Sequence, residues 1–496
     1  MSNSHHDMTT DELWEALNEA EGFERGHIFY TLALRHRSEE DWGQVIIFAE
    51  QSAEIMRALG STREEGYAYE LVGQALDGQH DHEAAITEFM KAASLFHEIN
   101  LDEGLGSVYA YAGYAARHKR DHVRSAEYFA LSETFYRQCT NEFEAVAGAT
   151  RDLGLSLGRI PGREHEALEA LLRALDAAQG SSELHFIYEL HDYLINAYAR
   201  VDNRTMALHH AETALRLGKT CPCNVCMPTA TYRLGVVYRE LGSPKSKKFI
   251  DDAYEIAKTN GNASLQAKCL VEFGRITMDD DLDQASEYFK DALVVVESTG
   301  FTGAIATCKR ELGRVAQRQG NLNQALAYLR EAIDAFSDDP DKCDIAVIEQ
   351  SIAEVLMQQG EFNAAVAVLE NNRWWSDTAP IHGVMVGNHM ALYARALLAA
   401  GRPADALQRA DQLLTQLASQ PWHAIVAPAH EVRARALQHK DPIASDRAAV
   451  QALAHYTLAN MHTEARTMAS EFFVEPYRVL SHVATDHDAR QPESMA

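Results

Sequence analysis

Residues 312–332 read LGRVAQRQGNLNQALAYLREA, and this stretch decides the fold class. A bulky residue and a glycine, Leu312-Gly313, are followed three positions later by an apolar residue and then by the turn Gly320-Asn321. After the turn, apolar residues recur at the spacing of one helix face, at Ala325, Leu329 and Ala332. The pattern predicts two antiparallel helices, with Gly320 supplying the left-handed conformation that ends the first one.

The same pattern recurs along the whole chain at a nearly constant period. Its small-residue anchor, Gly313 in the stretch above, falls at Ala33, Gly73, Gly113, Gly154, Ile195, Gly235, Gly274, Gly313, Ala353, Ala394 and Ala434. Successive anchors are 39 to 41 residues apart, and Ile195 is the one bulky member of the series. A stacked array has no ceiling on size, whereas a single core stops growing near about 250–300 residues. An array therefore explains how the chain reaches 496 residues.

The composition supports an all-α array of about eleven helix pairs. Hydrophobic residues make up 46% of the chain, and the 12 prolines fall mostly between the apolar-periodic stretches. Each small anchor allows the second helix of its pair to pack closely, and the alanines of that second helix admit the next pair. Since no pair buries its apolar stripe alone, neighbouring pairs must stack.

These motifs resemble the tetratricopeptide repeat (TPR) family. Residues 234–238 (LGVVY) match the first half of the family pattern, and residues 85–92 (AITEFMKA) match the second. The resemblance covers roughly residues 23–458 and implies a right-handed superhelical solenoid whose first helices line a concave face. The unit of about 40 residues exceeds the family's usual ~34. Long units of this kind look like the sensor regions of bacterial transcription activators, bacterial peptide-pheromone receptors and some eukaryotic polarity scaffolds.

The sequence outside the array predicts three further segments. Residues 1–22 are expected to form a polar start with a cap helix over residues 10–21. Residues 459–483 are expected to form a C-terminal capping helix, and the polar residues 484–496 a disordered tail. Trp374-Trp375 are expected to plug the junction of the ninth and tenth pairs, with an exposed aromatic patch as the alternative.

The net charge and the targeting signals limit the classes of partner and the cellular compartment that we expect. The net charge of −27 repels a polyanion, so duplex nucleic acid is not an expected partner. The N-terminus lacks the basic and apolar regions of a signal peptide, and the absence of an 18-residue apolar run predicts no membrane span. The seven cysteines, an odd number without an export signal, indicate reduced thiols in a cytoplasmic protein. The sequence leaves the oligomeric state open.

No motif predicts catalysis, and one cysteine cluster is the only candidate for a metal. The chain has no metalloprotease, nucleophile-elbow or phosphate-loop motif, so we expect no enzymatic activity and no cofactor. Cys221, Cys223 and Cys226 lie between the fifth and sixth pairs and could bind zinc with His209 or His210. Because no second cysteine pair occurs at matching spacing, the sequence favours reduced thiols or an incidental disulfide, with zinc as the alternative.

Arginines collect at the positions that the repeat register places on the inner face. Nine form the candidate ligand groove: Arg117, Arg151, Arg159, Arg200, Arg239, Arg275, Arg310, Arg314 and Arg318. Arg395 and Arg435 occupy the same register nearer the C-terminus, and acids at these places are fewer. Because a guanidinium binds a carboxylate bidentately, we expect the groove to hold an acidic or carboxylate-bearing protein or peptide segment. Apolar pockets at Tyr114, Tyr232 and Met278 would add to the affinity.

Two other hypotheses fit the same residues. The arginines could instead pair with acids of neighbouring repeats, Glu354 among them, or complement the dipoles at helix ends. Alternatively, the solenoid is a signalling receptor that a small peptide compacts and that regulates a partner protein. Only about 22 residues precede the first repeat, too few for the DNA-binding helix-turn-helix that such receptors often carry.

Overall fold

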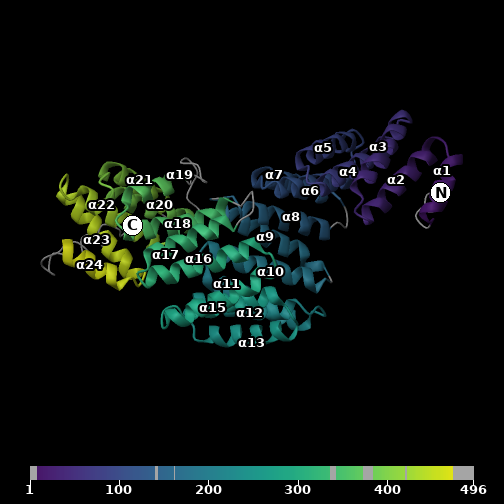
Figure 1. Cartoon of the computed structure of the whole chain (residues 1–496). Coiled ribbons are helices and arrows are strands. Elements are labelled where there is room, and N and C mark those ends of the chain that lie inside the picture. The colour runs from purple at the N-terminus through teal and green to yellow at the C-terminus, as the bar shows by residue number, and fades with distance from the viewer. Residues whose placement is uncertain are drawn as a thin grey trace, which may run out of the picture. The chain divides into compact units, whose positions relative to one another are not determined.

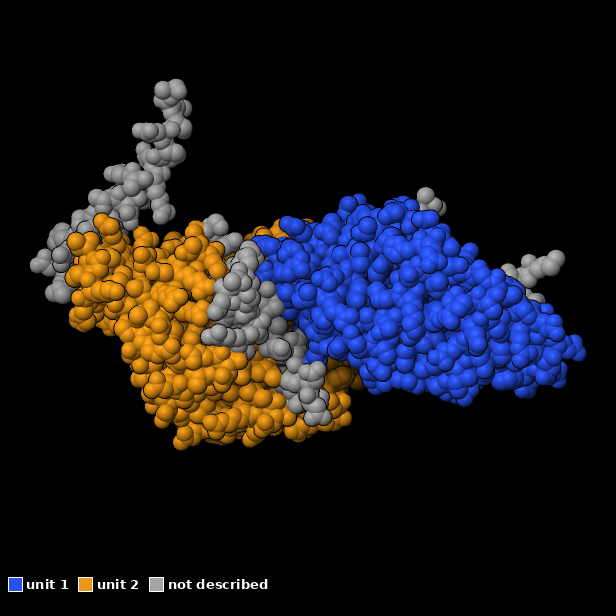
Figure 2. Space-filling model, turned by 90° about the horizontal axis from the view of Figure 1, so that it is seen from above, with its two compact units in different colours: residues 1–194 blue, residues 195–496 orange. Residues whose placement is uncertain are grey.

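The computed structural model describes residues 8–139, 143–160, 162–181, 183–335, 342–371, 384–418 and 422–472. Over these ranges the regular secondary structure comprises 24 α-helices and one short 3-10 helix, η1 (Ala178–Gly180), with no strand. The chain divides into two compact units, Met1–Leu194 and Ile195–Ala496, which Figure 2 colours blue and orange. The predicted all-α class is confirmed.

The helices follow one another along the chain (Figure 1). Those of the first unit are α1 (Thr10–Glu19), α2 (Gly22–Ser38), α3 (Trp42–Ala58), α4 (Thr62–Gly78), α5 (His82–Glu98), α6 (Asp102–His118), α7 (His122–Tyr136), α8 (Phe143–Leu157) and α9 (Glu164–Ala177). Helix α10 (Leu184–Arg200) crosses the boundary between the units.

The second unit continues from α10 with a further fourteen helices in its described residues. They are α11 (Arg204–Thr220), α12 (Cys226–Glu240), α13 (Lys245–Thr259), α14 (Ala263–Thr277), α15 (Leu282–Glu297), α16 (Thr302–Arg318), α17 (Leu322–Asp334), α18 (Lys342–Gln358), α19 (Phe362–Asn371), α20 (Val384–Ala399), α21 (Pro403–Gln416), α22 (His423–Leu437), α23 (Pro442–Leu458) and α24 (His462–Phe472).

Every predicted anchor lies in the first helix of a pair, which we call the A helix; the second is the B helix. Eleven pairs run from α2–α3 to α22–α23, with α1 before and α24 after them, so the predicted number of pairs is confirmed. Within each unit, A helices of neighbouring pairs are also in contact. For example, α4 contacts α6, and α12 contacts α14. The A helices of a unit therefore share one surface, the A-helix face.

The small anchors permit the close packing of each pair. A Cβ atom added at Gly73 would lie 2.5 Å from Cε1 of Phe89, and one at Gly274 would lie 2.5 Å from Cε1 of Phe289. Both phenylalanines belong to B helices and are almost wholly buried. Glycine is therefore required at these anchors, since a side chain would occupy the space of an aromatic ring.

The turns between helices use the left-handed backbone conformation. Gly320 has φ of 79°, as predicted, and lies in the turn between α16 and α17. His80 and Arg120 take the same conformation, with φ of 66° and 61°, at the equivalent turns of the second and third pairs. An aspartate then caps the next helix; the Asp81 carboxylate accepts the backbone N–H of Ala84.

The two ends of the array carry additional helices. Thr9 caps α1, and its hydroxyl accepts the backbone N–H of Glu12. Helix α24 buries Ala465 and Met468. The region beyond residue 472, and with it the expected tail, lies outside the described residues, as do Trp374-Trp375. None of the helices in the described ranges is both long and apolar enough to cross a membrane.

Candidate functional site

Two buried carboxylates organise the arginines of the second unit. Glu272 on α14 and Glu311 on α16 each precede their repeat's anchor by two residues, and their side chains are 1% and 0% exposed. Glu272 accepts hydrogen bonds from Arg239 Nε at 2.6 Å and from Arg275 Nη1 at 2.6 Å. Because a buried charge must be paired, Glu272 joins α12 to α14 through Arg239.

Glu311 contacts three guanidinium groups. Its carboxylate lies 2.7 Å from Arg275 Nη2, 3.0 Å from Arg310 Nη2 and 2.8 Å from Arg314 Nη1. Burial alone would raise the pKa of Glu311, but the charges of these three arginines lower it to about 2. Arg275 therefore bridges Glu272 and Glu311, and the four arginines with the two acids form one network, the arginine cluster.

The arginine cluster keeps more positive than negative charge. Two further acids face the four guanidiniums besides Glu272 and Glu311: Glu240, whose carboxylate lies 3.6 Å from Arg239, and Glu354, which interacts electrostatically with Arg314. Burial raises the pKa of both Glu240 and Glu354, which disfavours their charged forms. Arg314 is 47% exposed and reaches Glu311 through Nη1, so positive charge faces solvent at this point.

The first unit contains a smaller network of the same kind. Asp152 on α8 also stands two residues before its anchor and is 2% exposed. It pairs with Arg117 Nη1 at 2.9 Å and Arg151 Nη2 at 2.8 Å, and it accepts the hydroxyl of Tyr114 at 2.7 Å. Burial and the charge of Asp152 raise the pKa of Tyr114. Tyr114 thus donates a hydrogen bond to a buried acid, while its ring packs against Phe129.

The remaining predicted arginines lie in different surroundings. Arg318 pairs with Asp279 at 2.8 Å, and that aspartate is 86% exposed. Arg435 pairs with Glu431 at 3.0 Å and with Glu471 at 2.6 Å. Of the other three, Arg395 belongs to α20, Arg159 follows α8, and Arg200 is the last residue of α10. Arg159 and Arg200 are both exposed.

A cavity of about 470 Å³ opens beside the arginine cluster. Arg275 lines it together with Tyr232, Val271, Phe301 and Cys308, among other residues of α12 to α16. Phe301 is 61% exposed at its edge. The lining also includes a second cation, Lys268, and the hydroxyl residues Ser264, Thr299 and Thr307. Two cations beside apolar side chains suit a ligand group that carries both an apolar part and a negative charge. Of the predicted pockets, Tyr232 lines this one, whereas Met278 belongs to the core.

The structure gathers the three cysteines of the connection between α11 and α12. Cys221, Cys223 and Cys226 form one group of candidate metal ligands with His185, and the two histidines expected from the sequence are not in it. His210 instead stacks on Tyr198. Burial alone would raise the pKa of Cys223, but hydrogen bonds, chiefly from Cys226, lower it to about 6.

The sequence reasoning missed the buried acids, although a signal was present. Acids stand two residues before the anchor at Asp152, Glu272 and Glu311. Each lies 33 to 36 residues after an arginine that binds it, as Asp152 does after Arg117. That separation is close to one repeat, so an arginine with an acid about 35 positions later is the pattern to seek.

Comparisons with known proteins agree with the repeat architecture. Residues 276–338 match the family model of the tetratricopeptide repeat. Among curated proteins, none matches the chain. The structure of the apo form of RapI aligns with 18% identity and a TM-score of 0.47, covering 55% of this chain and 97% of that one.

Two further solved structures resemble the chain to a similar degree. The apo form of the quorum sensor NprR from B. thuringiensis aligns with 13% identity and a TM-score of 0.49, covering 66% of this chain and 91% of that one. Aspartyl phosphate phosphatase F from Bacillus subtilis aligns with 12% identity and a TM-score of 0.47, covering 66% and 87%.

Proposed function

Because the chain is a tetratricopeptide repeat protein, we propose that it is a non-catalytic scaffold that binds an acidic segment of a partner protein at the A-helix face of its second unit. The observation that carries this proposal is the convergence of Arg275, Arg310 and Arg314 on the single carboxylate of Glu311. The buried acid fixes the guanidiniums in place, so a ligand carboxylate meets donors that are already oriented.

In this proposal the arginines have different roles, whereas in a simple basic groove every arginine would contact the ligand. Arg275 is 24% exposed and makes contacts to two carboxylates, so its main role is to hold the cluster together. Arg314 is 47% exposed and presents the positive charge to solvent. We therefore assign ligand contact to Arg314, and the support of its position to Glu311.

The adjoining cavity defines the second half of the ligand. Arg275 belongs both to the cluster and to the lining of the cavity, where it neighbours Val271 and Phe301. A segment with an apolar side chain next to an aspartate, a glutamate or a free C-terminal carboxylate would fill the cavity and meet Arg314. The net charge of −27 on the whole chain makes this local positive surface unusual and thereby selective.

The test uses a peptide array in which every acidic-apolar peptide has a counterpart with amides in place of its carboxylates. We expect acidic members to bind and amide members to bind at least about tenfold more weakly, which corresponds to about 1.4 kcal/mol. Fluorescence anisotropy then gives the Kd of the best peptide. Added salt should weaken the binding, since partly exposed charges are screened.

The key variant is Arg314→Gln, which removes the charge without placing a second carboxylate beside Glu311. We expect it to raise the Kd about tenfold or more, since a hydrogen bond to a charged group contributes about 1.5–3 kcal/mol. Arg330→Gln is the matched control, because Arg330 lies exposed on the B helix α17 and the charge change is the same. Equal Kd values for the two variants, or equal binding of acidic and amide peptides, would refute the proposal.

A further inference from the structure

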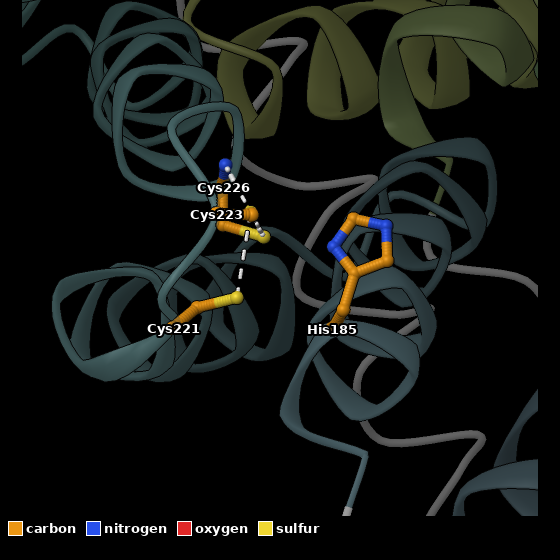
Figure 3. A group of neighbouring side chains, drawn as sticks. All are labelled: His185, Cys221, Cys223 and Cys226. Atoms are coloured by element: carbon orange, nitrogen blue, oxygen red, sulfur yellow. Dashed lines mark hydrogen bonds between the residues drawn. The ribbon is translucent and has the colours of Figure 1, made fainter.

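We propose that Cys221, Cys223 and Cys226, together with His185, bind one zinc ion at the connection between α11 and α12. Figure 3 shows the three thiols with the imidazole of His185 beside them. The connection is five residues long, from Cys221 to Val225, and Cys226 is the first residue of α12. The proposal is independent of the function assigned above.

The sulfur atoms are grouped too tightly for ordinary packing. Cys221 Sγ lies 3.4 Å from Cys223 Sγ, and Cys223 Sγ lies 2.8 Å from Cys226 Sγ. Ordinary non-bonded heavy atoms keep about 3.5–4.0 Å. In a tetrahedral zinc site, ligands at about 2.3 Å place the sulfurs roughly 3.8 Å apart, so modest opening of the group would admit the ion. All four candidate ligand atoms already lie within 4.8 Å of one another.

The orientation of His185 fits a metal ligand. Its Nε2 atom faces the carboxylate of Glu189 at 3.4 Å, one helical turn along α10. The other ring nitrogen is turned toward the thiols (Figure 3). In zinc sites, a carboxylate that accepts a hydrogen bond from one ring nitrogen commonly orients the histidine and raises the basicity of the other ring nitrogen. Helix α10 continues into the second unit, where it contains the anchor Ile195. Helices α10 and α11 are the A and B helices of the same pair.

The backbone at this connection differs from that of five other B-to-A connections. Five of those in the described ranges contain a residue with positive φ: Gly60, Asn100, Gly261, Gly300 and Asn460. Helix α11 ends instead on Cys221 in an extended conformation. Gly218 lets the helices approach, since a Cβ there would lie 3.0 Å from Cα of Met227. The usual helix ending has thus been replaced by one that brings three sulfurs together.

Zinc accounts for the whole group better than a disulfide does. A disulfide joins two sulfurs at about 2.05 Å. It would use two of the three thiols and leave the third, and the imidazole, without a role. A four-ligand site of three thiolates and one imidazole uses every member, and Cys223 and Cys226 have the two-residue spacing common among structural zinc sites. None of the described cysteines forms a disulfide.

The test begins with the metal content of the full chain, purified without chelator and dialysed extensively. We expect one zinc per chain by elemental analysis, and its release in proportion to the thiols blocked by a mercurial reagent. Replacement of the zinc by Co²⁺ should give the visible bands of a tetrahedral ion with thiolate charge transfer. These measurements use the unaltered chain, so they do not depend on the folding of a variant.

Variants then locate the site. Cys223→Ser should lose the zinc, whereas Cys139→Ser, which changes a cysteine on the loop after α7, should retain one zinc per chain. His185→Ala should weaken Co²⁺ binding and alter its spectrum. Less than a tenth of an equivalent of zinc after reconstitution under reducing conditions, or retention by Cys223→Ser, would overturn the proposal. A thiol count on denatured protein prepared without reductant is a further test. A count of five thiols for the seven cysteines would reveal a disulfide and would also overturn the proposal.

Discussion

Replacement of Glu311 by glutamine would remove the negative charge on which three guanidiniums converge. The side chain is 0% exposed, and Arg275, Arg310 and Arg314 all lie within 3.0 Å of its oxygens. The amide of Glu311→Gln fills the same volume but cannot neutralise these charges. We therefore expect a clear loss of stability that has no contribution from a cavity.

The magnitude follows from two independent estimates. The pKa of Glu311 lies at about 2 instead of 4.5, and at about 1.36 kcal/mol per unit this difference corresponds to about 3 kcal/mol at neutral pH. Removal of one partner of a buried ion pair typically costs about 3–5 kcal/mol. We expect Glu311→Gln to lower the free energy of unfolding by about 3 kcal/mol at pH 7.

The sign of the pH dependence provides a second check. Because the folded state lowers the pKa of Glu311, its stabilisation is present above pH 4.5 and is lost as the pH falls toward about 2. The native chain and Glu311→Gln should therefore differ most at neutral pH. Their difference should shrink progressively through this acidic window.

Urea unfolding followed by circular dichroism gives the midpoint, and hydrogen exchange of α14 and α16 locates the effect. Exchange is needed because repeats open locally as well as globally. A loss of about 3 kcal/mol should speed exchange in these helices by roughly 100-fold. Glu287→Gln is the control, because this 62% exposed residue pairs with Lys290 at the surface, where a pair contributes at most about 1 kcal/mol. A change of less than about 0.5 kcal/mol for Glu311→Gln would refute the role assigned to the buried acid.

Four further predictions concern other residues of the array. Burial raises the pKa of Glu70 to about 7, so stability should fall as the pH rises from 4.5 to 7, and Glu70→Gln should raise the melting temperature at pH 8 but not at pH 4.5. Burial lowers the pKa of His389 to about 4, so hydrogen-exchange protection of α20 should fall as the pH drops from 6.5 to 4, and His389→Gln should abolish that dependence. Gly274→Ala should cost about 1–3 kcal/mol in urea titrations, since its Cβ would lie 2.5 Å from a ring atom of Phe289. Gly148→Ala, where no atom lies within 4 Å of the added carbon, should stabilise by about 0.5–1 kcal/mol.

The repeat architecture could be predicted from the sequence because each pair contacts mainly its neighbours. The spacing of 39 to 41 residues placed all eleven A helices, even at Ile195, where the small anchor is missing. There the B helix α11 supplies three buried alanines, Ala207, Ala211 and Ala214. In a stacked array the local pattern and the global packing carry the same information, since one repeat is the environment of the next.

The sites were less accessible from the sequence, because a periodic pattern assigns a residue to a face but does not select its partner. The register grouped Arg275, Arg310, Arg314 and Arg318 and suggested Glu354 as an opposing acid. The structure joins the first three to Glu311, and Arg275 also to Glu272, whereas Arg318 pairs with Asp279. Glu354 does interact electrostatically with Arg314.

The sequence by itself determined the helix pairs and their number, since these follow from helical periodicity and the size of the anchors. The tertiary structure decided which charges are buried and which side chains meet. His185 stands 36 residues before Cys221, whereas His210, the nearer histidine in sequence, stacks on Tyr198. Positions about one repeat apart face each other only after the helices stack, and the rotation of each helix then selects one neighbour among several.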